Sequence, residues 1–116
     1  MDIISMMVSL MNELTCRSIT SGGYVKGRLM TSPSGETYLY GVTVLYPNGY
    51  GADITAGSII DPYMKWELAV VRQIAGEKFG SWDITYDTPI TSDVVHNLDV
   101  LEVLEICKDI ENLPAI

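Results

Sequence analysis

The sequence predicts an α+β fold, in which an antiparallel sheet of four or five strands, a β-meander, carries one helix from each end of the chain. Three observations lead to this fold class. Apolar residues recur at helical spacing at both ends, residues alternate with a period of two in the middle, and turn signals separate the alternating runs. The 116 residues fit one domain, 1–116, which is long enough to bury a core without disulfides or metals.

The first predicted element is an amphipathic helix of about four turns. We expect it to end near Arg17, before Ser21, Gly22 and Gly23 break the pattern. Four methionines fall in this segment. They could form an adaptable docking face for a partner, but methionine more often fills irregular gaps in a core. The stripe predicted to be buried consists of Ile3, Met7, Leu10 and Leu14.

Five runs rich in Tyr, Val, Thr and Leu follow, and each has the alternation of a strand. Turn-forming segments separate them. Pro47-Asn48-Gly49 gives the strongest hairpin signal, because Asn and Gly tolerate positive φ. Further connections are expected around 57–62 and 75–80. The predicted strands are 24–30, 36–46, 50–55, 65–74 and 82–87.

Tyr38, Tyr40 and Tyr46 have the same strand parity as Val42 and Val44, so one face of the meander is expected to carry a row of tyrosines. An exposed row could stack on bases or form an interface. Base stacking normally comes with many basic neighbours, and this part of the chain supplies only two. Packing of the tyrosines beneath the helices is therefore the preferred interpretation.

Helical spacing returns after the last predicted strand. Residues 93–98 are expected to form a short helix that is capped by Thr91 or Ser92. Asp99 and Glu102 then have the spacing of a capping box, which predicts the start of a second helix that ends before Pro114. The buried stripe of this helix consists of Val100, Val103, Leu104, Cys107 and Ile110, through to Leu113.

The charge of the chain is concentrated at its C-terminal end. The net charge is −8, and residues 77–116 carry nine acidic side chains and only two lysines, a net charge of −7. On the last predicted helix, Glu102, Glu105 and Asp109 stand in one row, where like charges repel by about 0.2–0.5 kcal/mol per pair. This concentration favours partner binding as the role of the carboxylates. The scarcity of Lys and Arg argues against direct binding to nucleic acid or to anionic membranes.

No catalytic site is predicted. His96 is the only histidine and lies three residues from both Asp93 and Asp99, so a carboxylate could orient it as in a hydrolytic set. However, the chain has no serine in a glycine-flanked turn, and Cys107 falls on the predicted buried stripe. An exposed helix histidine is the preferred interpretation.

No metal or cofactor site is predicted either. Asp83, Asp87 and Asp93 lack the spacing of a calcium loop and suit turns and helix starts better. One histidine and two distant cysteines, Cys16 and Cys107, are too few ligands for zinc. We expect both cysteines to be reduced.

The glycine-rich segments and the apolar N-terminal segment indicate neither a phosphate-binding loop nor a targeting sequence. The glycines at 22–23 and 49–51 lack the further glycine or lysine of a phosphate-binding loop, so both are interpreted as turns. The apolar N-terminal segment is flanked by Asp2 rather than by a basic residue, which argues against a signal peptide. No run approaches the roughly 18 apolar residues of a spanning helix. We therefore expect a cytoplasmic protein.

Two segments, KWELAVV at 65–71 and ITYDTPITSDVVHNLDVLEVLEICKDIENLP at 84–114, resemble small acidic accessory proteins of unknown function encoded by phages and prophages. In these, an NGYG hairpin precedes an ELAV strand, and a YDTPIT-DV turn leads into a C-terminal helix. The likeness covers residues 41–113. Related accessory classes include anti-CRISPR and anti-restriction proteins, which commonly occupy the basic grooves of nuclease complexes. The resemblance implies such a role, but it assigns a role to no single residue.

We therefore expect a binding protein, not an enzyme, that acts in the host cytoplasm and inhibits a host defence or nucleic-acid-processing complex with a basic groove. The alternative is a small self-assembling structural protein, joined as a homodimer or larger oligomer through its N-terminal helix or an open sheet edge. A third class, an enzyme or a nucleotide-binding sponge, would need a pocket with convergent polar groups. The residues expected to form one contiguous partner-binding surface are Glu102, Glu105, Asp109, Glu111, Asp83, Asp87 and Asp93.

Overall fold

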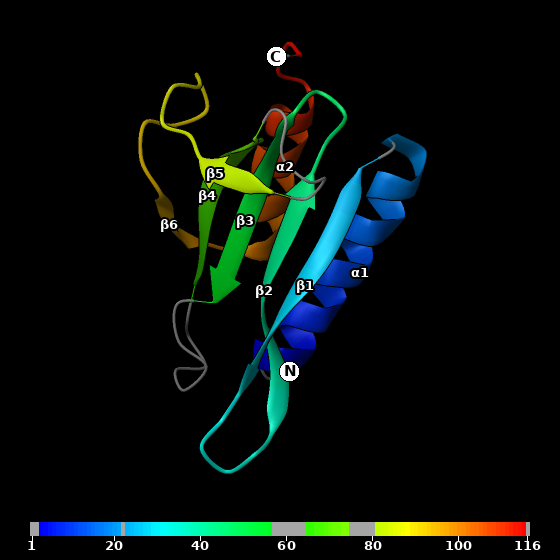
Figure 1. The fold of residues 1–116 in the computed structure, drawn as a ribbon, viewed down its shortest axis with the longest axis vertical. Coiled ribbons are helices and arrows are strands. Elements are labelled where there is room, and N and C mark those ends of the chain that lie inside the picture. The colour runs from blue at the N-terminus through cyan, green and yellow to red at the C-terminus, as the bar shows by residue number, and fades with distance from the viewer. Residues whose placement is uncertain (1–2, 22, 57–64, 75–80, 116) are drawn as a thin grey trace.

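The computed structural model of the chain describes residues 3–21, 23–56, 65–74 and 81–115, and it confirms the α+β fold (Figure 1). Within these residues the elements are α1 (Ile3–Ser21), β1 (Tyr24–Thr31), β2 (Thr37–Leu45), β3 (Tyr50–Ala56), β4 (Trp66–Gln73), β5 (Trp82–Ile84), β6 (Val95–Leu98) and α2 (Val100–Glu111). The connections expected at 57–62 and 75–80 lie outside the described residues.

The strands form one antiparallel sheet in the order β1-β2-β3-β4-β5, and β6 also pairs with β4. β5 pairs with the end of β4 near Val71, and β6 pairs with the other end near Trp66. Four of the strands, β1 to β4, agree with the predicted ones within one residue at each end, whereas β5 ends at Ile84 rather than at residue 87. The sixth, β6, was not expected.

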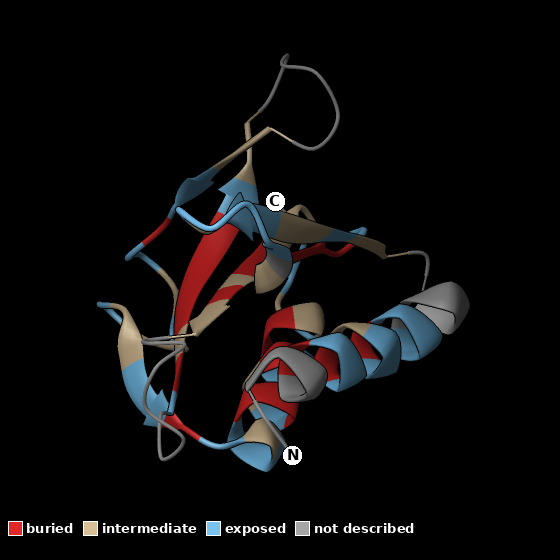
Figure 2. Cartoon of the chain, turned by 90° about the horizontal axis from the view of Figure 1, so that it is seen from below, coloured by how far each residue is buried: buried red, intermediate tan, exposed pale blue. Residues whose placement is uncertain are grey.

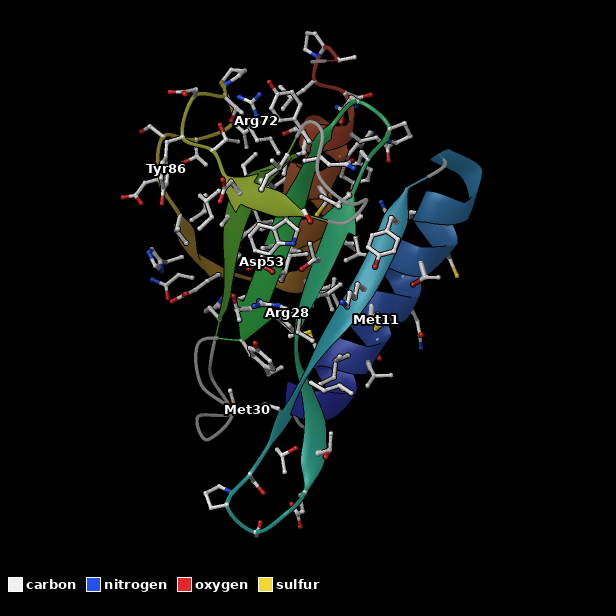
Figure 3. The ribbon with its side chains drawn as sticks, in the orientation of Figure 1. Met11, Arg28, Met30, Asp53, Arg72 and Tyr86 are labelled. Carbon is white, nitrogen blue, oxygen red and sulfur yellow. The ribbon has the colours of Figure 1, made fainter. Side chains whose placement is uncertain are left out.

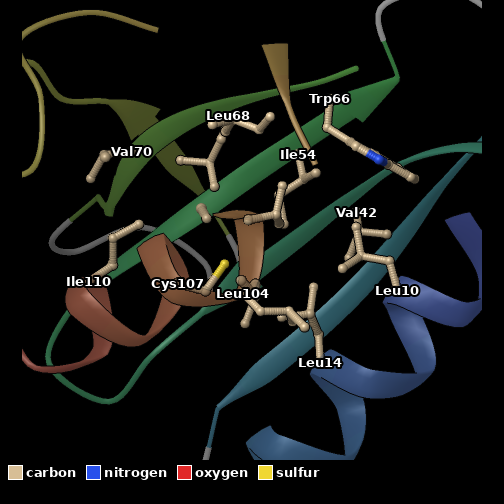
Figure 4. Packing of buried hydrophobic residues seen from close by; sticks show 14 of the residues in the cluster. Leu10, Leu14, Val42, Ile54, Trp66, Leu68, Val70, Leu104, Cys107 and Ile110 are labelled. Carbon is tan, nitrogen blue, oxygen red and sulfur yellow. The ribbon is translucent and has the colours of Figure 1, made fainter. Parts of the chain in front are cut away.

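Both helices cover the same face of this sheet. α1 packs on β1 and β2, while α2 packs on β3 and β4, behind the sheet in the view of Figure 1. The core lies between the helices and the sheet, where the buried segments gather in Figure 2. Leu10 and Leu14 of α1 and Cys107 and Ile110 of α2 meet the inward side chains of the central strands there (Figure 4).

A second, smaller buried group lies on the opposite face of the sheet. Leu45, Ala69 and Val71 are buried but are not part of the main core. Leu45 pairs with Gly51, and Gly51 pairs with Val71, so Leu45 and Val71 lie on either side of Gly51 across β2, β3 and β4. Ala69 lies two residues before Val71 on β4 and therefore has the same strand parity. A Cβ at Gly51 would overlap the carbonyl oxygen of Val44. Gly51 is therefore a strand residue required by close packing, and its interpretation as a turn residue was wrong.

Helix α1 is longer than expected. It continues to Ser21 rather than ending near Arg17. The three residues after Arg17 include no glycine or proline, so nothing in the backbone stops the helix before Gly22. Met7 is fully buried and Met11 packs against the core, which supports the core-filling interpretation for these two methionines.

The short helix predicted over 93–98 is wrong, because this segment contains β6. Leu98 pairs with Trp66 of β4 and is buried, so the segment gains a tertiary contact that a capped helix would lack. Asn97 has φ 59°, which an α-helix does not allow. The Thr91 hydroxyl accepts a hydrogen bond from the Asp93 N–H at 3.1 Å and donates to the Asp93 carbonyl at 2.9 Å, which makes a local turn.

The tyrosine row expected on β2 is interrupted by an irregularity in its pairing with β1. Arg28 pairs with Gly41, but the next residue, Leu29, pairs with Leu39. Tyr40 is therefore an extra residue on β2, as in a β-bulge. Side chains before and after Tyr40 therefore do not keep the strict alternation between the two faces of the sheet.

The bulge places Tyr40 on the face of the sheet away from the helices. A Cβ at Gly27 would meet Met11 of α1, so Arg28, the next residue, faces away from α1. The Tyr40 ring lies against Arg28, with 4.9 Å between the guanidinium carbon and the ring centroid. Tyr46, in contrast, is buried in the core. The side chain of Tyr38 lies outside the description.

Both ends of α2 are capped by side chains. At its N-terminus, Asp99 Oδ1 accepts the Glu102 N–H at 2.8 Å and Glu102 Oε1 accepts the Asp99 N–H at 3.2 Å, which confirms the predicted capping box. At its C-terminus, Asn48 Nδ2 of the β2–β3 turn donates to the carbonyls of Ile110 (2.9 Å), Glu111 (3.2 Å) and Leu113 (3.0 Å).

Asn48 also fixes its own turn. Its Oδ1 accepts the Tyr50 N–H at 3.0 Å, and Gly49 adopts φ 92°, a conformation that favours glycine. The Gly49 N–H donates to the Tyr46 carbonyl at 3.1 Å. One amide group thus joins the β2–β3 hairpin to the end of a helix more than 60 residues later in the chain.

Replacement of Asn48 should therefore destabilise the protein. We expect Asn48→Ala to lower the free energy of unfolding by about 1–3 kcal/mol, because carbonyls at the end of α2 lose their donor. Asn48→Asp keeps an acceptor for the Tyr50 N–H but faces the same carbonyls with a negative charge, so it should be at least as destabilising at neutral pH. Urea denaturation measures both. Asn12→Ala, on the exposed side of α1, is the control. Wild-type stability of Asn48→Asp would contradict the capping role.

Candidate partner-binding surfaces

The carboxylate row predicted on α2 exists. Glu102, Glu105 and Asp109 are exposed and are spaced by three and four residues, so they lie on one side of the helix. Glu102 also takes part in the capping box, which fixes its side chain near the start of the helix. These three carboxylates form what we call the α2 acidic row.

Glu111 does not belong to this row. It follows Glu102 by nine residues, which is two and a half helical turns, so the two side chains leave opposite sides of α2. Glu111 is half-buried. It lines a cavity of about 250 Å³ together with Leu14, Tyr46 and Lys108.

Asp83 lies on β5, and Asp87 lies in the segment that follows this strand. Both are exposed, and both line a cavity of about 440 Å³ beside β5 with Arg72 and Tyr86, which Figure 3 labels. Asp93 is exposed in the segment before β6, and its Oδ1 accepts the Val94 N–H at 2.7 Å. The seven predicted residues therefore do not form one contiguous surface, and only the α2 acidic row presents three of them together.

None of the seven predicted carboxylates forms an ion pair within the part of the chain that the structure describes. The pairs found there are Arg17–Glu13, Arg28–Asp53 and His96–Glu67. The last joins His96 Nδ1 of β6 to Glu67 Oε1 of β4 at 3.1 Å. His96 is exposed as expected, but on a strand rather than on a helix.

Sequence reasoning missed a charged cluster on the face of the sheet away from the helices. Arg28 Nη2 lies 2.9 Å from Asp53 Oδ1, which also accepts a hydrogen bond from the Thr43 hydroxyl at 3.1 Å (Figure 3). The guanidinium stacks on Tyr40 and lies so close over Gly41 that a Cβ there would be 2.7 Å from Nη2. A side chain at position 41 would therefore push the guanidinium out of its present position.

The contact between Arg28 and Asp53 is electrostatic. Arg28 Nε and Nη2 are buried and make no hydrogen bond of good geometry with any described residue, although Nη2 is at ion-pair distance from the carboxylate. Burial raises the pKa of Asp53, while the Arg28 charge and the Thr43 hydrogen bond act in the opposite direction, and burial dominates. The side chains of Arg28 and Asp53 are largely removed from water, with exposed fractions of 28% and 12%, and their contact fits a structural ion pair.

The two cysteines lie in different environments. Both are free; Cys16 is exposed and Cys107 is buried. Burial raises the pKa of the Cys107 thiol to about 12, although a hydrogen bond with Tyr46 lowers it in part. A neutral buried thiol is a poor nucleophile. No group of three or more His, Cys, Asp or Glu side chains in the described ranges could hold a metal ion.

Comparison with known proteins adds no assignment. No family model, curated protein or solved structure matches the chain. Among the helices that the structure describes, none is long and apolar enough to cross a membrane.

The Arg28–Asp53 pair predicts a specific response to pH. Because the folded pKa of Asp53 is raised, its ionisation destabilises the folded state above that pKa, and the penalty disappears as the pH falls below the unfolded value. We expect Arg28→Met to raise the Asp53 pKa further and to cost about 1–3 kcal/mol at pH 7, because a buried charge loses its partner. Carboxyl NMR titration and denaturation at several pH values measure these effects.

The double variant Arg28→Met/Asp53→Asn provides the matched control. It removes both charges, so it should recover part of the stability lost at pH 7 and should lose the pH dependence of the single variant. An unchanged Asp53 pKa in Arg28→Met would contradict the proposed coupling.

Proposed function

We propose that this chain is a phage-type binding protein that inhibits a host defence or nucleic-acid-processing complex, in the manner of anti-CRISPR proteins, through the α2 acidic row. The observation that carries the proposal is the exposure of Glu102, Glu105 and Asp109 on one side of α2, with no ion pair to any described cation. Like charges placed in a row weaken a helix. A cationic partner would offset the repulsion among these carboxylates by attracting all three of them.

The spacing of the row suits a surface that normally holds a nucleic acid strand. At about 1.5 Å rise per residue, the three carboxylates are separated by about 4.5 and 6 Å along the axis of α2. Phosphates follow one another at about 3.4 Å of axial rise along one strand of DNA. The row thus offers roughly one carboxylate for every one to two phosphates, and Arg and Lys side chains bind carboxylates and phosphates in similar ways.

The partner that fits this surface is a host protein complex with a basic nucleic-acid-binding groove, met in the host cytoplasm. A net charge of −8 would speed the encounter with such a groove and would disfavour direct binding to nucleic acid or membranes. The proposed function requires neither catalysis nor a cofactor. Asp83, Asp87 and Asp93 would contribute mainly to this long-range attraction, because they lie outside the row.

A charge-reversal experiment tests the proposal. The variant Glu102→Gln/Asp109→Lys changes the net charge by +3 and keeps the capping box, since Gln also accepts at that position. Lysine near the C-terminus of α2 is compatible with the helix dipole, so the fold should be retained. We expect the variant to lose inhibition of a purified CRISPR effector or restriction nuclease by at least about tenfold, and wild-type inhibition to weaken steeply with added salt.

The matched control is Glu13→Gln/Glu36→Lys, which makes the same change in net charge away from α2. If the control loses inhibition equally, net charge rather than the α2 acidic row is responsible. If wild-type inhibition ignores ionic strength, the electrostatic mechanism is wrong. Circular dichroism of each variant checks the fold.

A further inference from the structure

The cavity beside β5 brings together charges of both signs and an exposed aromatic residue. Its volume of about 440 Å³ suits a small molecule, since ligand pockets typically measure roughly 300–1,000 Å³. Arg72 of β4 and Asp83 of β5 are direct partners across the two strands, and both line the cavity together with Asp87. Tyr86 is 50% exposed and also lines the cavity. Figure 3 labels Arg72 and Tyr86 at this end of the sheet.

The segment after β5 is held in place before any ligand arrives. Thr85 is buried, and its N–H donates to the Val70 carbonyl of β4 at 2.9 Å. The Thr85 hydroxyl accepts a hydrogen bond from the Asp87 N–H at 3.4 Å. These two contacts fix the backbone on both sides of Tyr86, so little conformational freedom is lost when a ligand binds there.

The three charges that line this cavity do not neutralise one another. Arg72 and Asp83 face each other across β4 and β5 but form no ion pair, and Asp87 forms none with any described residue either. All three residues are exposed. Among the described residues that line the cavity, these are the charged ones, so the lining supplies one positive and two negative charges. A ligand that carries the opposite set of charges would pair with all three.

A free basic amino acid carries that opposite set. At neutral pH, lysine and arginine each have one carboxylate and two cationic groups. The carboxylate can accept two parallel hydrogen bonds from the Arg72 guanidinium, and each cation can pair with one aspartate. A cation near the face of the Tyr86 ring gains further attraction. A nucleotide fits the same lining poorly, because several phosphate charges would meet two carboxylates and a single arginine.

We propose that the cavity beside β5 binds a free basic amino acid, lysine or arginine. Arg72 holds the carboxylate of this ligand, and Asp83 and Asp87 hold its two cationic groups. Tyr86 packs against the ligand side chain. The site involves neither α2 nor the α2 acidic row, so the inference goes beyond the proposed inhibitory function and does not rest on it.

Isothermal titration calorimetry of the full chain with arginine and with lysine tests the site. We expect saturable binding of at least one of the two. Two analogues of that amino acid, the amine without the carboxylate (agmatine or cadaverine) and the Nα-acetyl derivative without the α-ammonium charge, should each bind at least about tenfold more weakly, because each loses one charged contact. Absence of saturable binding of both amino acids overturns the proposal. So does binding of either analogue that is as tight as that of the amino acid.

A variant of Arg72 tests the assigned contact. Arg72→Met should weaken binding of the amino acid at least about tenfold but should not weaken binding of the amine, which has no carboxylate for Arg72 to hold. Because Arg72 is exposed, the variant should keep the fold. Lys26→Met is the matched control, since it removes one positive charge from β1, at the other end of the strand order.

Equal losses in Arg72→Met and Lys26→Met, or an equal loss for the amine and the amino acid in Arg72→Met, overturn the proposed site. These measurements contain no nuclease. Their failure is therefore distinguishable from a failure of nuclease inhibition.

Discussion

The position of α2 depends on the side-chain amide of Asn48. Its nitrogen donates to three carbonyls at the end of α2, and its oxygen accepts an N–H from the first residue of β3. The capping box at Asp99 is local and fixes only where the helix begins. The Asn48 contact fixes where the helix ends relative to the sheet. Together with the burial of Cys107 and Ile110, it sets the rotation of α2 about its own axis. The direction in which the α2 acidic row points is therefore a consequence of a turn residue in the β2–β3 hairpin.

Local signals allowed most of the fold to be predicted, and tertiary contacts explain the rest. The hairpin turns, the alternating strands and the capping box each depend on residues close together in the sequence. Residues 93–98 were mistaken for a helix because Thr91 and Ser92 are good caps, whereas the contact that decides their conformation joins Leu98 to Trp66. The bulge at Tyr40 depends on the register between two strands, which neither strand specifies by itself. At residues 93–98 the local pattern was overridden because pairing with β4 sets Leu98 beside Trp66, where both are buried.

The candidate site also combines features that local sequence patterns predict with features that depend on tertiary contacts. Helical periodicity correctly placed Glu102, Glu105 and Asp109 together, and the same periodicity places Glu111 on the opposite side of α2. Asp83, Asp87 and Asp93 were grouped by their density in the sequence, which says nothing about distance in space. An ion pair at Asp53 could have been predicted from the sequence, because a carboxylate between Ala52 and Ile54 in a buried strand requires a partner. Its partner, Arg28, could not be deduced without the pairing of β1 with β2 and of β2 with β3.

The electrostatic character of α2 differs between its outward row and its flank toward α1. The outward row, Glu102, Glu105 and Asp109, repels any acidic molecule, including a second copy, and attracts a cationic groove. On the flank toward α1, Lys108 and the Arg17–Glu13 ion pair lie near Glu105 and Glu111, so basic side chains partly offset the negative charge there. Glu105 lies where the two surfaces meet. The negative field of α2 is therefore strongest along its outward row, and this is the side of the helix toward which a cationic group would be drawn.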